Sequence, residues 1–556
     1  MINKIRLKFG HTSEAQAEEI NITHITVFVG PNNSGKSKIL SELFQYCREG
    51  IKNAQDVILD EVTFAAIDTA EAEAAINNIL LKPNFNETIQ EGNILVGKFG
   101  ERIQINYGVL VQAVKSPSTN HNSFCHYFLR YSTLMLNGMN RINLTHKQPA
   151  GDLQSPPQTS FQVLFKNREK RYEVRRIIND AFNLHFVIDP TELGQFKIRL
   201  SSNSPANELE ECGIHTEAIQ FHAAALPIER ASDGVKAFTG IITEVIAGDP
   251  HIILIDEPEA FLHPALSYKL GLELSRAAAK SEKRVFISTH SSSYLMGCIQ
   301  SGVPVNIVRL TYHSGIATAR LLPSNEILNL MRNPLLRSTG VLNGLFYEYV
   351  VVTESDADRA FYQEINERLL RFKPEWGIPN CLFINAQNKQ TIHTIINPLR
   401  KLGIPAAGIV DVDVVKEGGR SWTNLLSGAN IPEINQQALS TFRGNIKKAM
   451  DDSGKDMKRE GGINILKDEN YEAAENLLRQ LSEYGIFVVP GGELESWLKT
   501  LGATGHGPNW LIEMFEKMGE DAESLNYVRP ENNDVWDFMK SVNEWLINPK
   551  RKGIPK

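Results

Sequence analysis

Short apolar runs alternate with amphipathic stretches along most of this 556-residue chain. In the N-terminal part, β-branched runs predict strands at 2–9 and 22–29, and a helix at 36–48 follows a glycine-rich turn. Continuous apolar runs at 251–255 and 284–288, with helical patterns between them, are typical of buried strands in a parallel sheet. The pattern therefore predicts an α/β fold for this part of the chain.

A second α/β pattern begins after a break in the periodicity, and we place a domain boundary near 335–345. The segment 440–470 is polar and lysine-rich and contains Gly454 and the pair Gly461-Gly462, so it is predicted to be an insertion or a mobile loop. The expected strands are 347–353, 381–385, 406–410 and 486–490, and the expected helices are 357–372 and 391–402.

The region from about 50 to 225 gives weaker signals, with an alanine-rich acidic helix at 65–81 and a strand pair near 94–114. A stretch dense in lysine and arginine follows at 166–176, with aromatic residues among the charges. Two interpretations stay open for this stretch: a solvated helix face partnered by Glu169 and Glu173, or a patch that contacts phosphates.

Composition narrows the class of protein. Hydrophobic residues make up 42% and charged residues 22%, which fits a globular chain. The net charge of −7 means that any binding of nucleic acid must come from local basic patches. The five cysteines are far apart, which argues against a disulfide framework and a zinc site. Every apolar run is too short to span a bilayer, so we expect a cytoplasmic protein with no membrane partner.

One eight-residue segment fits the phosphate-binding pattern GxxxxGK[ST], Gly30-Pro-Asn-Asn-Ser-Gly-Lys-Ser37, between a predicted strand and a predicted helix. Backbone N–H groups around Gly30, Asn33 and Gly35 would wrap the phosphates of ATP. The Lys36 ammonium would reach the β and γ phosphates, and the Ser37 hydroxyl would bind Mg²⁺.

A second set of polar residues follows two of the buried strands. Asp256 and Glu257 come directly after the apolar run at 252–255, and His290 follows the next strand. At the end of a strand near the phosphates, Asp256 can hold Mg²⁺ and Glu257 can polarise the attacking water. His290 can sense or orient the γ-phosphate, which makes Glu257 and His290 candidate catalytic residues.

These motifs resemble the ABC-type ATPase heads of the SMC, RecF and Rad50 class, with Asp256-Glu257 as Walker B and His290 as the switch histidine. In that class a signature segment of a second subunit closes on the nucleotide. The segment 230–236 is the candidate here, and Ser232 and Gly234 are its predicted nucleotide-binding residues. It departs from the family's LSGGQ pattern at two intervening positions, Ala231 and Asp233. The resemblance implies a homodimer or a higher homo-oligomer, with Gln112 as the candidate Q-loop residue.

Carboxylates also follow two strands of the second α/β pattern. Glu354 ends one strand, with Asp358 four residues later on the predicted helix, and Asp411 and Asp413 end another strand. Carboxylate oxygens at the ends of adjacent parallel strands suit Mg²⁺ or Mn²⁺, and two such ions can cleave a phosphodiester. For the Asp411 motif alone, an ordinary helix cap or a solvated turn is the competing interpretation.

The four acids in this frame resemble a Toprim domain, and an ABC-type ATPase followed by Toprim resembles the OLD (overcoming lysogenization defect) family, which includes Gabija and retron-associated defence nucleases. The resemblance implies that Glu354, Asp358, Asp411 and Asp413 are metal-binding and catalytic. A further metal-binding acid is expected after the last strand, and Glu495 is preferred to Glu493. Ser355 replaces the family's usual glycine, and the catalytic lysine is either Lys540 or a lysine of the 447–458 loop.

The resulting expectation is a cytoplasmic, ATP-binding, Mg²⁺- or Mn²⁺-dependent DNA endonuclease of anti-phage defence. Expected partners are DNA, a second copy of the chain, and a protein or nucleic acid of a defence system. The expected domains are an ATPase (1–335) with insertions and a dimerisation region at about 50–225, a Toprim domain (345–500) and a helical extension (501–556). The main rival is an ATP-driven DNA-binding or structural-maintenance protein whose Toprim unit does not cut.

Overall fold

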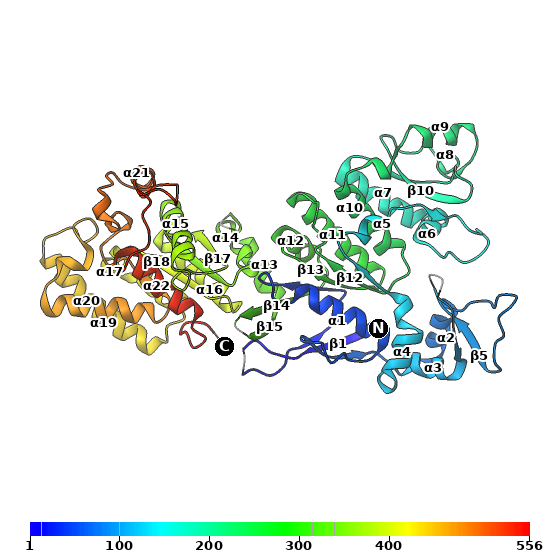
Figure 1. Cartoon of the computed structure of the whole chain (residues 1–556), viewed down its shortest axis with the longest axis horizontal. Helices are drawn as coiled ribbons and strands as arrows, with labels where there is room; N and C mark the ends of the chain where they lie inside the picture. The colour runs from blue at the N-terminus through cyan, green and yellow to red at the C-terminus, as the bar shows by residue number, and fades with distance from the viewer. Residues whose placement is uncertain (13, 99–100, 314, 339, 556) are drawn as a thin grey trace. The chain divides into compact units, whose positions relative to one another are not determined.

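The computed structural model describes residues 1–12, 14–98, 101–313, 315–338 and 340–555. The chain forms two compact units, Met1–Leu328 and Asn329–Lys556, and each is described by itself (Figure 1). Both units contain a parallel sheet with helices packed on it. Among the described residues, no helix has both the length and the apolar character needed to cross a membrane.

The strands of the first unit are β1 (Ile2–Leu7), β2 (Glu19–Asn21), β3 (Ile25–Val29), β4 (Leu59–Phe64), β5 (Asn93–Val96), β6 (Ile103–Asn106), β7 (Thr133–Leu136), β8 (Gln148–Pro149), β9 (His185–Asp189), β10 (Gln195–Ser201), β11 (Leu226–Pro227), β12 (Ile252–Asp256), β13 (Arg284–Ser288), β14 (Val305–His313) and β15 (Ile316–Leu322). Its helices are α1 (Lys36–Glu49), α2 (Thr69–Asn77), α3 (Tyr107–Lys115), α4 (His121–Tyr127), α5 (Asn140–Asn143), α6 (Ser160–Lys166), α7 (Arg168–Phe182), α8 (Glu208–Cys212), α9 (Thr216–Ala224), α10 (Asp233–Ala247), α11 (Pro264–Lys280) and α12 (Ser292–Gln300), and α13 (Ser324–Arg332) leads into the second unit.

The central sheet of the first unit has the strand order β15-β14-β3-β13-β12-β7. The five strands from β14 to β7 are parallel, and β15 pairs antiparallel with β14. The segments after β3, β13 and β12 therefore leave the sheet at the same edge. Helix α1 packs on β7, β12 and β13, and it shares a hydrophobic cluster with the three-stranded sheet β2-β1-β4.

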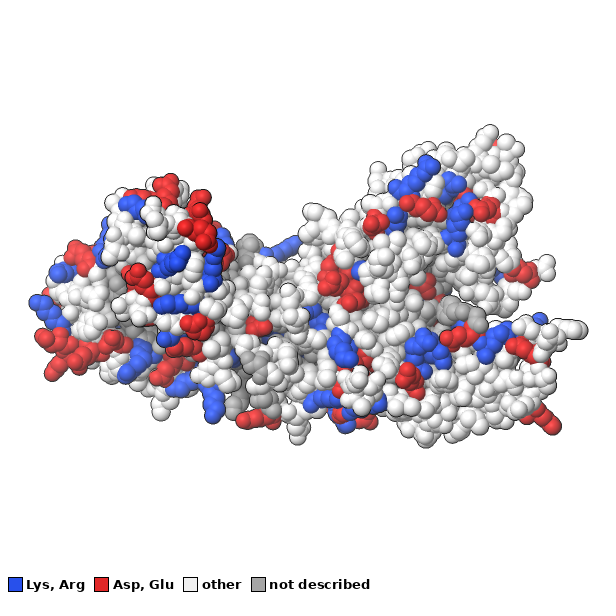
Figure 2. All heavy atoms as spheres, in the orientation of Figure 1, with Lys and Arg blue, Asp and Glu red and all other residues white. Residues whose placement is uncertain are grey.

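The basic stretch at 166–176 forms most of α7, and two of its arginines point inward. Arg171 and Arg175 are buried, and both contact the buried Glu211 carboxylate. Arg171 also donates to Glu208 at 2.8 Å. The prediction of a solvated face is therefore wrong for these two arginines, because their charges are neutralised inside the unit by acids from α8. On the face drawn in Figure 2, basic and acidic side chains are interspersed in both units.

Two other predictions made from local patterns are corrected. Residues 107–114, predicted as part of a strand pair, instead lie in α3, which the Asn106 side chain caps by accepting a 3.2 Å bond from the Val109 amide. The segment 440–470, predicted to be an insertion or a mobile loop, is helical in its first part, because α19 (Glu433–Asp452) runs through it. The apolar side chains that bury one face of α19 are widely spaced and easily overlooked in a polar sequence, namely Leu439, Ile446 and Met450.

The second unit is built on a parallel sheet with the strand order β17-β16-β18-β19. Its central strands β16 and β18 are buried throughout. The elements of this unit are α14 (Pro334–Ser338), β16 (Tyr349–Thr353), α15 (Asp356–Phe372), β17 (Cys381–Asn385), α16 (Ile392–Lys401), β18 (Ala406–Val410), α17 (Asp413–Lys416), α18 (Gly419–Gly428), α19, α20 (Asp468–Ser482), β19 (Ile486–Val488), α21 (Pro508–Met518) and α22 (Asp534–Ile547).

The C-terminal helices belong to the core of this unit. Trp510 of α21 and Trp536 of α22 lie in the same hydrophobic cluster as Val351 and Phe361. The buried Arg400 guanidinium joins separate segments, because it donates to the carbonyl oxygens of Ala406, Ala429 and Gly485 at 2.9, 2.8 and 3.2 Å. Burial lowers the pKa of Arg400 to about 9.

We expect Arg400→Met to lower the free energy of unfolding of the second unit by about 3 kcal/mol, because several buried carbonyls would lose their donor. Tryptophan fluorescence during urea unfolding measures this unit alone, since all six tryptophans lie in residues 329–556. The control is Arg371→Met, whose side chain is 57% exposed in a 3.8 Å ion pair, with an expected change within about 0.5 kcal/mol. Equal changes in the two variants would contradict the role given to Arg400.

Candidate functional site

The phosphate-binding loop lies between the buried strand β3 and helix α1. Gly30 has φ +143°, and a Cβ there would lie 2.0 Å from the Leu310 carbonyl oxygen. Gly35 has φ +95° and caps α1, and Asn33 has φ 61°. Left-handed backbone at these positions curls the loop so that its amides can face a bound anion at the start of α1. The sequence predicted all three as nucleotide-binding residues.

The Lys36 ammonium is held inside the curl of this loop. It donates to the carbonyl oxygens of Gly30 and Pro31 at 2.9 and 2.7 Å, and its side chain is buried. Burial lowers the pKa of Lys36 to about 8, and the nearby Glu257 and Asp256 carboxylates partly oppose this shift. A phosphate entering the loop would offer this ammonium a stronger acceptor than the two carbonyls.

The predicted Walker B residues meet the loop at the edge of the sheet. Asp256 Oδ1 accepts a 2.9 Å hydrogen bond from the Ser37 hydroxyl and another from the Ser288 hydroxyl. The two residues predicted to bind magnesium at the nucleotide, Ser37 and Asp256, are therefore in direct contact. His290 Nε2 lies 3.8 Å from Glu257 Oε1, and burial with the nearby Lys36 charge lowers the pKa of His290.

Sequence reasoning missed Arg141, which lies just after β7. Its buried guanidinium donates to the carbonyl oxygens of Glu257 and Asp256 at 2.5 and 3.3 Å. Glu257 has φ 49°, a left-handed conformation that is costly for a residue with a side chain. Arg141 therefore helps to fix the backbone that carries the candidate catalytic carboxylate. A single arginine after a short strand matches no sequence motif, so nothing in the sequence pointed to Arg141.

Glu259 is a second residue that the sequence analysis did not single out. One carboxylate oxygen accepts from the His290 amide and from the Thr289 hydroxyl, each at 2.8 Å. Burial raises the pKa of Glu259. This acid joins the segments after β12 and β13, so it helps to hold His290 opposite Glu257.

The predicted signature segment lies at the start of α10. Ser232 is exposed and its hydroxyl makes no capping hydrogen bond, whereas Gly234 is buried. A Cβ at Gly234 would lie 2.6 Å from the Phe261 carbonyl oxygen, so packing within the unit already requires glycine there. No hydrogen bond or ion pair among the described residues links Ser232 or Gly234 to the phosphate loop. Gln112 is exposed on α3, which packs against α2 and α4.

The second unit brings three of its predicted acids together. Glu354 follows β16, and Asp411 and Asp413 follow the adjacent strand β18. One potential ligand atom from each of the three acids lies within 4.8 Å of those from the other two. The Asp411 amide donates to Glu354 Oε1 at 2.9 Å, which connects the ends of the two strands.

The electrostatics and donor chemistry of this acidic cluster (Glu354, Asp411 and Asp413) fit a divalent cation. Burial and the Asp411 charge raise the pKa of Glu354, and burial raises the pKa of Asp411 against the opposing effect of Lys458. Asp413 Oδ1 is buried and has no hydrogen-bond partner among the residues that the structure describes. Carboxylate oxygens are the hard ligands that Mg²⁺ and Mn²⁺ prefer, and a bound cation would satisfy the orphaned oxygen.

Asp358 has a different local role. Its Oδ2 accepts from the amide and the hydroxyl of Ser355 at 2.9 and 2.7 Å, and the Ser355 hydroxyl accepts from the Asp358 amide. Burial raises the pKa of Asp358. This capping box begins α15 and explains the serine at the position where a glycine was expected. Asp358 is near the acidic cluster, but one of its oxygens is already used by the cap.

Of the lysines left open by the sequence, Lys458 lies at the acidic cluster. Its ammonium is 2.8 Å from Asp411 Oδ2 and 3.6 Å from Asp413 Oδ2. Lys540 instead lies over the Trp376 ring, at 4.6 Å from its centre. Lys389, which the sequence analysis missed, pairs with Asp413 at 2.6 Å.

The acids after β19 form a separate group with a histidine. Glu493, Glu495 and His506 have potential ligand atoms within 4.8 Å of one another. Glu495 Oε1 accepts from the Gly507 amide at 2.7 Å and pairs with His506 Nδ1 at 2.6 Å. Glu493, rather than the preferred Glu495, is the acid that faces Lys458, at 3.8 Å.

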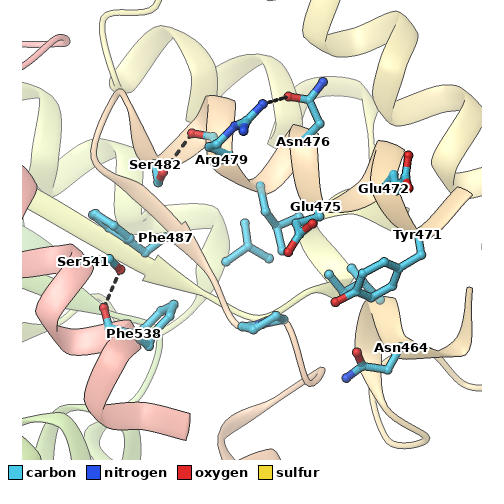
Figure 3. Close-up of a pocket in the computed structure, with 14 residues that line it drawn as sticks. Asn464, Tyr471, Glu472, Glu475, Asn476, Arg479, Ser482, Phe487, Phe538 and Ser541 are labelled. Carbon is cyan, nitrogen blue, oxygen red and sulfur yellow. Dashed lines mark hydrogen bonds between the residues drawn. The ribbon is translucent and has the colours of Figure 1, made fainter. Parts of the chain in front are cut away.

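A cavity of about 670 Å³ opens beside β19, between α20 and α22 (Figure 3). Phe487 and Phe538 lie on one side of it, and Tyr471, Glu472 and Glu475 of α20 lie on another. Glu354, Asp411 and Asp413 do not line this cavity, so it is distinct from the acidic cluster.

Two family models match separate parts of the chain. Residues 165–297 match AAA_21, an AAA domain whose description also names the AbiEii toxin of a type IV toxin–antitoxin system. Residues 345–413 match the TOPRIM domain of overcoming lysogenization defect protein-like proteins. The first match includes Asp256, Glu257 and His290 and begins after the phosphate loop. The second begins just before β16 and ends at Asp413.

Several solved structures of SMC heads are similar to the chain. An Smc head bound to the C-winged helix domain of ScpA has 11% identity and a TM-score of 0.33. The match covers 59% of this chain and 99% of the Smc head chain. The SMC head domain from Thermotoga maritima has 13% identity and a TM-score of 0.30, with coverages of 58% and 99%. A Pyrococcus furiosus Smc head with an extended coiled coil, bound to the C-terminal domain of ScpA, has 11% identity and a TM-score of 0.29, with coverages of 60% and 98%. No curated protein matches the chain.

The protein thus consists of a P-loop ATPase domain followed by a Toprim domain of the OLD-like type. In this domain order the chain matches the OLD family of ATPase–Toprim nucleases, and the resemblance inferred from the motifs is confirmed. The α/β fold class predicted for both parts is confirmed as well.

We expect Lys36→Ala to weaken ATP binding by about a hundredfold, because at least one charge-assisted contact with the β and γ phosphates is lost. Equilibrium dialysis with ATP and Mg²⁺ measures the affinity. Glu257→Gln is the control, since it should bind ATP like the parent and hydrolyse it slowly. Unchanged affinity in Lys36→Ala would remove this loop as the nucleotide site.

Proposed function

We propose that this protein is an ATP-binding, divalent-metal-dependent DNA endonuclease whose nucleotide state controls cleavage at the Toprim domain. The observation that carries the proposal is the acidic cluster at the ends of β16 and β18. Three carboxylates there converge within 4.8 Å, and an oxygen of Asp413 is buried without a hydrogen-bond partner in the described part of the chain. An acid cluster with only a structural role would have its oxygens satisfied by the protein.

In this proposal, the residues of the acidic site have different roles. Glu354, Asp411 and Asp413 would hold Mg²⁺ or Mn²⁺, which supplies an activated water and stabilises the leaving oxygen of a phosphodiester. Glu354 also fixes the position of Asp411, because Glu354 Oε1 accepts a 2.9 Å hydrogen bond from the Asp411 amide. Asp358 begins α15 and supports the turn that carries Glu354. DNA would be held mainly by exposed lysines and arginines, so its binding should weaken with salt.

In this proposal, the ATPase domain controls cleavage through its nucleotide state. Ser37, Asp256, Glu257 and His290 converge beside the phosphate loop, which is the arrangement needed to bind and hydrolyse ATP. Ser232 precedes the first residue of a 15-residue helix, and its exposed hydroxyl makes no hydrogen bond that caps the helix. A γ-phosphate held by a second copy could bind there. We therefore include an ATP-dependent homodimer in the proposal.

A role in defence against phage is part of the same proposal. It rests on the OLD-like match and on the toxin named in the description of the AAA domain. Such a role would make DNA and a further protein or nucleic acid of the defence system the partners. The rival function is an ATP-driven DNA-binding protein whose Toprim domain does not cut, and the experiment below separates the two.

We expect Asp411→Ala to abolish cleavage of plasmid DNA while leaving ATP binding and folding intact, because the two sites lie in units with separate hydrophobic cores. Nicking is measured on gels with Mg²⁺ or Mn²⁺, with and without ATP, and should stop with EDTA. Asp452→Ala is the matched control, an exposed acid at the end of α19 in the same unit. Its cleavage should equal that of the parent.

A double variant with Glu354 and Asp411 replaced that still nicks plasmid would place the chemistry elsewhere. If the parent protein also fails to cut under every metal and nucleotide condition, while DNA binding persists, the non-cutting rival becomes the preferred function. Loss of cutting in Asp452→Ala as well would show that the assay reports stability rather than the metal site.

For the dimer, we expect Glu257→Gln with ATP and Mg²⁺ to sediment as a dimer, because slow hydrolysis preserves the closed state. Adding Ser232→Arg should return it to a monomer, since the larger side chain would block approach of the second phosphate loop. Sedimentation velocity at several protein concentrations measures both. A monomer with and without ATP in Glu257→Gln would contradict the split nucleotide site.

A further inference from the structure

Strand β19 lies at the edge of the sheet in the second unit and pairs only with β18 among the described strands. Gly485 accepts from β18 through its carbonyl oxygen, and Val489 donates to β18 through its amide, each at 2.9 Å. In a parallel pair, alternate residues bond to the same neighbour, so Phe487 also faces β18. The backbone N–H and C=O groups of Ile486 and Val488 therefore point to the outer side of the sheet.

The outward backbone groups of Val488 have no partner although the residue is buried, with 4% of its surface exposed. No hydrogen bond among the described residues uses its amide or its carbonyl oxygen. Two residues later, the carbonyl oxygen of Pro490 accepts a 2.9 Å bond from the Ile463 amide. Buried backbone groups are normally paired, so a further segment is expected to continue this bonding along β19.

The cavity of about 670 Å³ lies on this open side of β19, where Val488 and Pro490 contribute to its lining (Figure 3). The ring of Phe487 faces α22, since it packs against the Phe538 ring with 6.1 Å between the centroids. Side chains alternate across a sheet, so Val488 faces the other way. An extended segment added to β19 would likewise direct alternate side chains toward α22 and toward α20.

The two helices that border the cavity offer different chemistry to such a segment. Glu472 and Glu475 of α20 are exposed, and no ion pair of the described residues includes either of them. Arg479, also on α20, donates to Asn476 at 2.9 Å. On the other side, α22 contributes the ring of Phe538. Basic side chains are therefore complementary to the α20 side, and apolar side chains to the α22 side.

This chain contains stretches in which basic and apolar residues alternate, at 4–7 and 196–200, but they are already paired within sheets as parts of β1 and β10. The basic residues near the C-terminus are also held, because Ile554 packs on the hydrophobic cluster of its own unit. A second copy would have to break one of these arrangements to supply the segment. The occupant is therefore sought in a different protein.

We propose that the open side of β19 binds an extended segment of a partner protein, in which basic residues alternate with apolar ones. The segment pairs with the backbone of Val488, places its basic side chains beside Glu472 and Glu475, and packs its apolar side chains on Phe538. This docking surface goes beyond the proposed nuclease function, because it lies apart from the acidic cluster. Its test measures binding and not cleavage, so the two proposals can fail separately.

The test uses a fluorescein-labelled peptide with the sequence Gly-Lys-Val-Lys-Val-Lys-Gly, and fluorescence anisotropy measures its binding to the full-length protein. Glu472→Lys combined with Glu475→Lys should weaken binding at least about tenfold, because attraction becomes repulsion. The matched control is Glu367→Lys combined with Glu516→Lys, two exposed acids of α15 and α21 outside the cavity. This control makes the same change in net charge, and its affinity should stay within about twofold of the parent.

A second pair of peptides tests the pairing with the backbone of β19. Alternate residues of a strand direct their N–H groups to opposite edges, so N-methylation of the lysine amides and N-methylation of the valine amides block different edges. One of these peptides should bind about a hundredfold more weakly than the unmethylated peptide, because the hydrogen bonds to Val488 are lost. The other should bind like the unmethylated peptide.

Absence of saturable binding up to about 1 mM peptide would overturn the proposal. Equal losses in the Glu472 and Glu475 double variant and in its matched control would also overturn it, since overall charge would then explain the binding. The same affinity for both N-methylated peptides would exclude pairing with the edge of β19. A dimer that the peptide converts to a monomer in sedimentation velocity would identify a second copy as the occupant, against the partner protein proposed.

Discussion

Both candidate sites depend on one constraint, which is that parallel strands deliver the segments following them to a single edge of the sheet. In the first unit this edge receives the phosphate loop after β3, the acids after β12 and His290 after β13. In the second unit it receives Glu354 after β16 and the Asp411 pair after β18. Residues far apart in the chain therefore meet at this edge, and the apolar strands fix their spacing.

The same arrangement concentrates negative charge, and each site contains a lysine that offsets part of it. In the nucleotide site Lys36 lies in the loop and is bonded to backbone carbonyls, so ATP phosphates can take it over without breaking an ion pair. In the Toprim site Lys458 and Lys389 are paired directly with the carboxylates. Under the proposed function, the ligand of the first site is an anion that meets a lysine, whereas the ligand of the second is a cation that meets carboxylates already paired with lysines.

The strands and the motif residues could be predicted from the sequence because both are encoded locally, by apolar runs and by the acids that end them. Side chains that contact these residues from distant segments could not be predicted in this way. Arg141 reaches its site from the short helix α5 with no spacing rule, and Arg171 pairs with acids 37 and 40 residues away. Lys458 was only one of several lysines that the sequence left open. Asp358 fits two local patterns at once, since its spacing from Glu354 predicts a metal ligand and its spacing from Ser355 forms a helix cap.

Five of the cations discussed above fall into two groups by their chemistry. Arg141, Arg175 and Arg400 donate to backbone carbonyls of segments outside their own element, and a planar guanidinium with five donors can hold several such segments at once. Lys36 and Lys458 instead place a single point charge at each candidate ligand site. An arginine at either lysine position would keep the charge but would make more contacts that a ligand has to break. The choice of lysine at the two sites and of arginine in the framework therefore follows from whether the contact has to be exchanged during function.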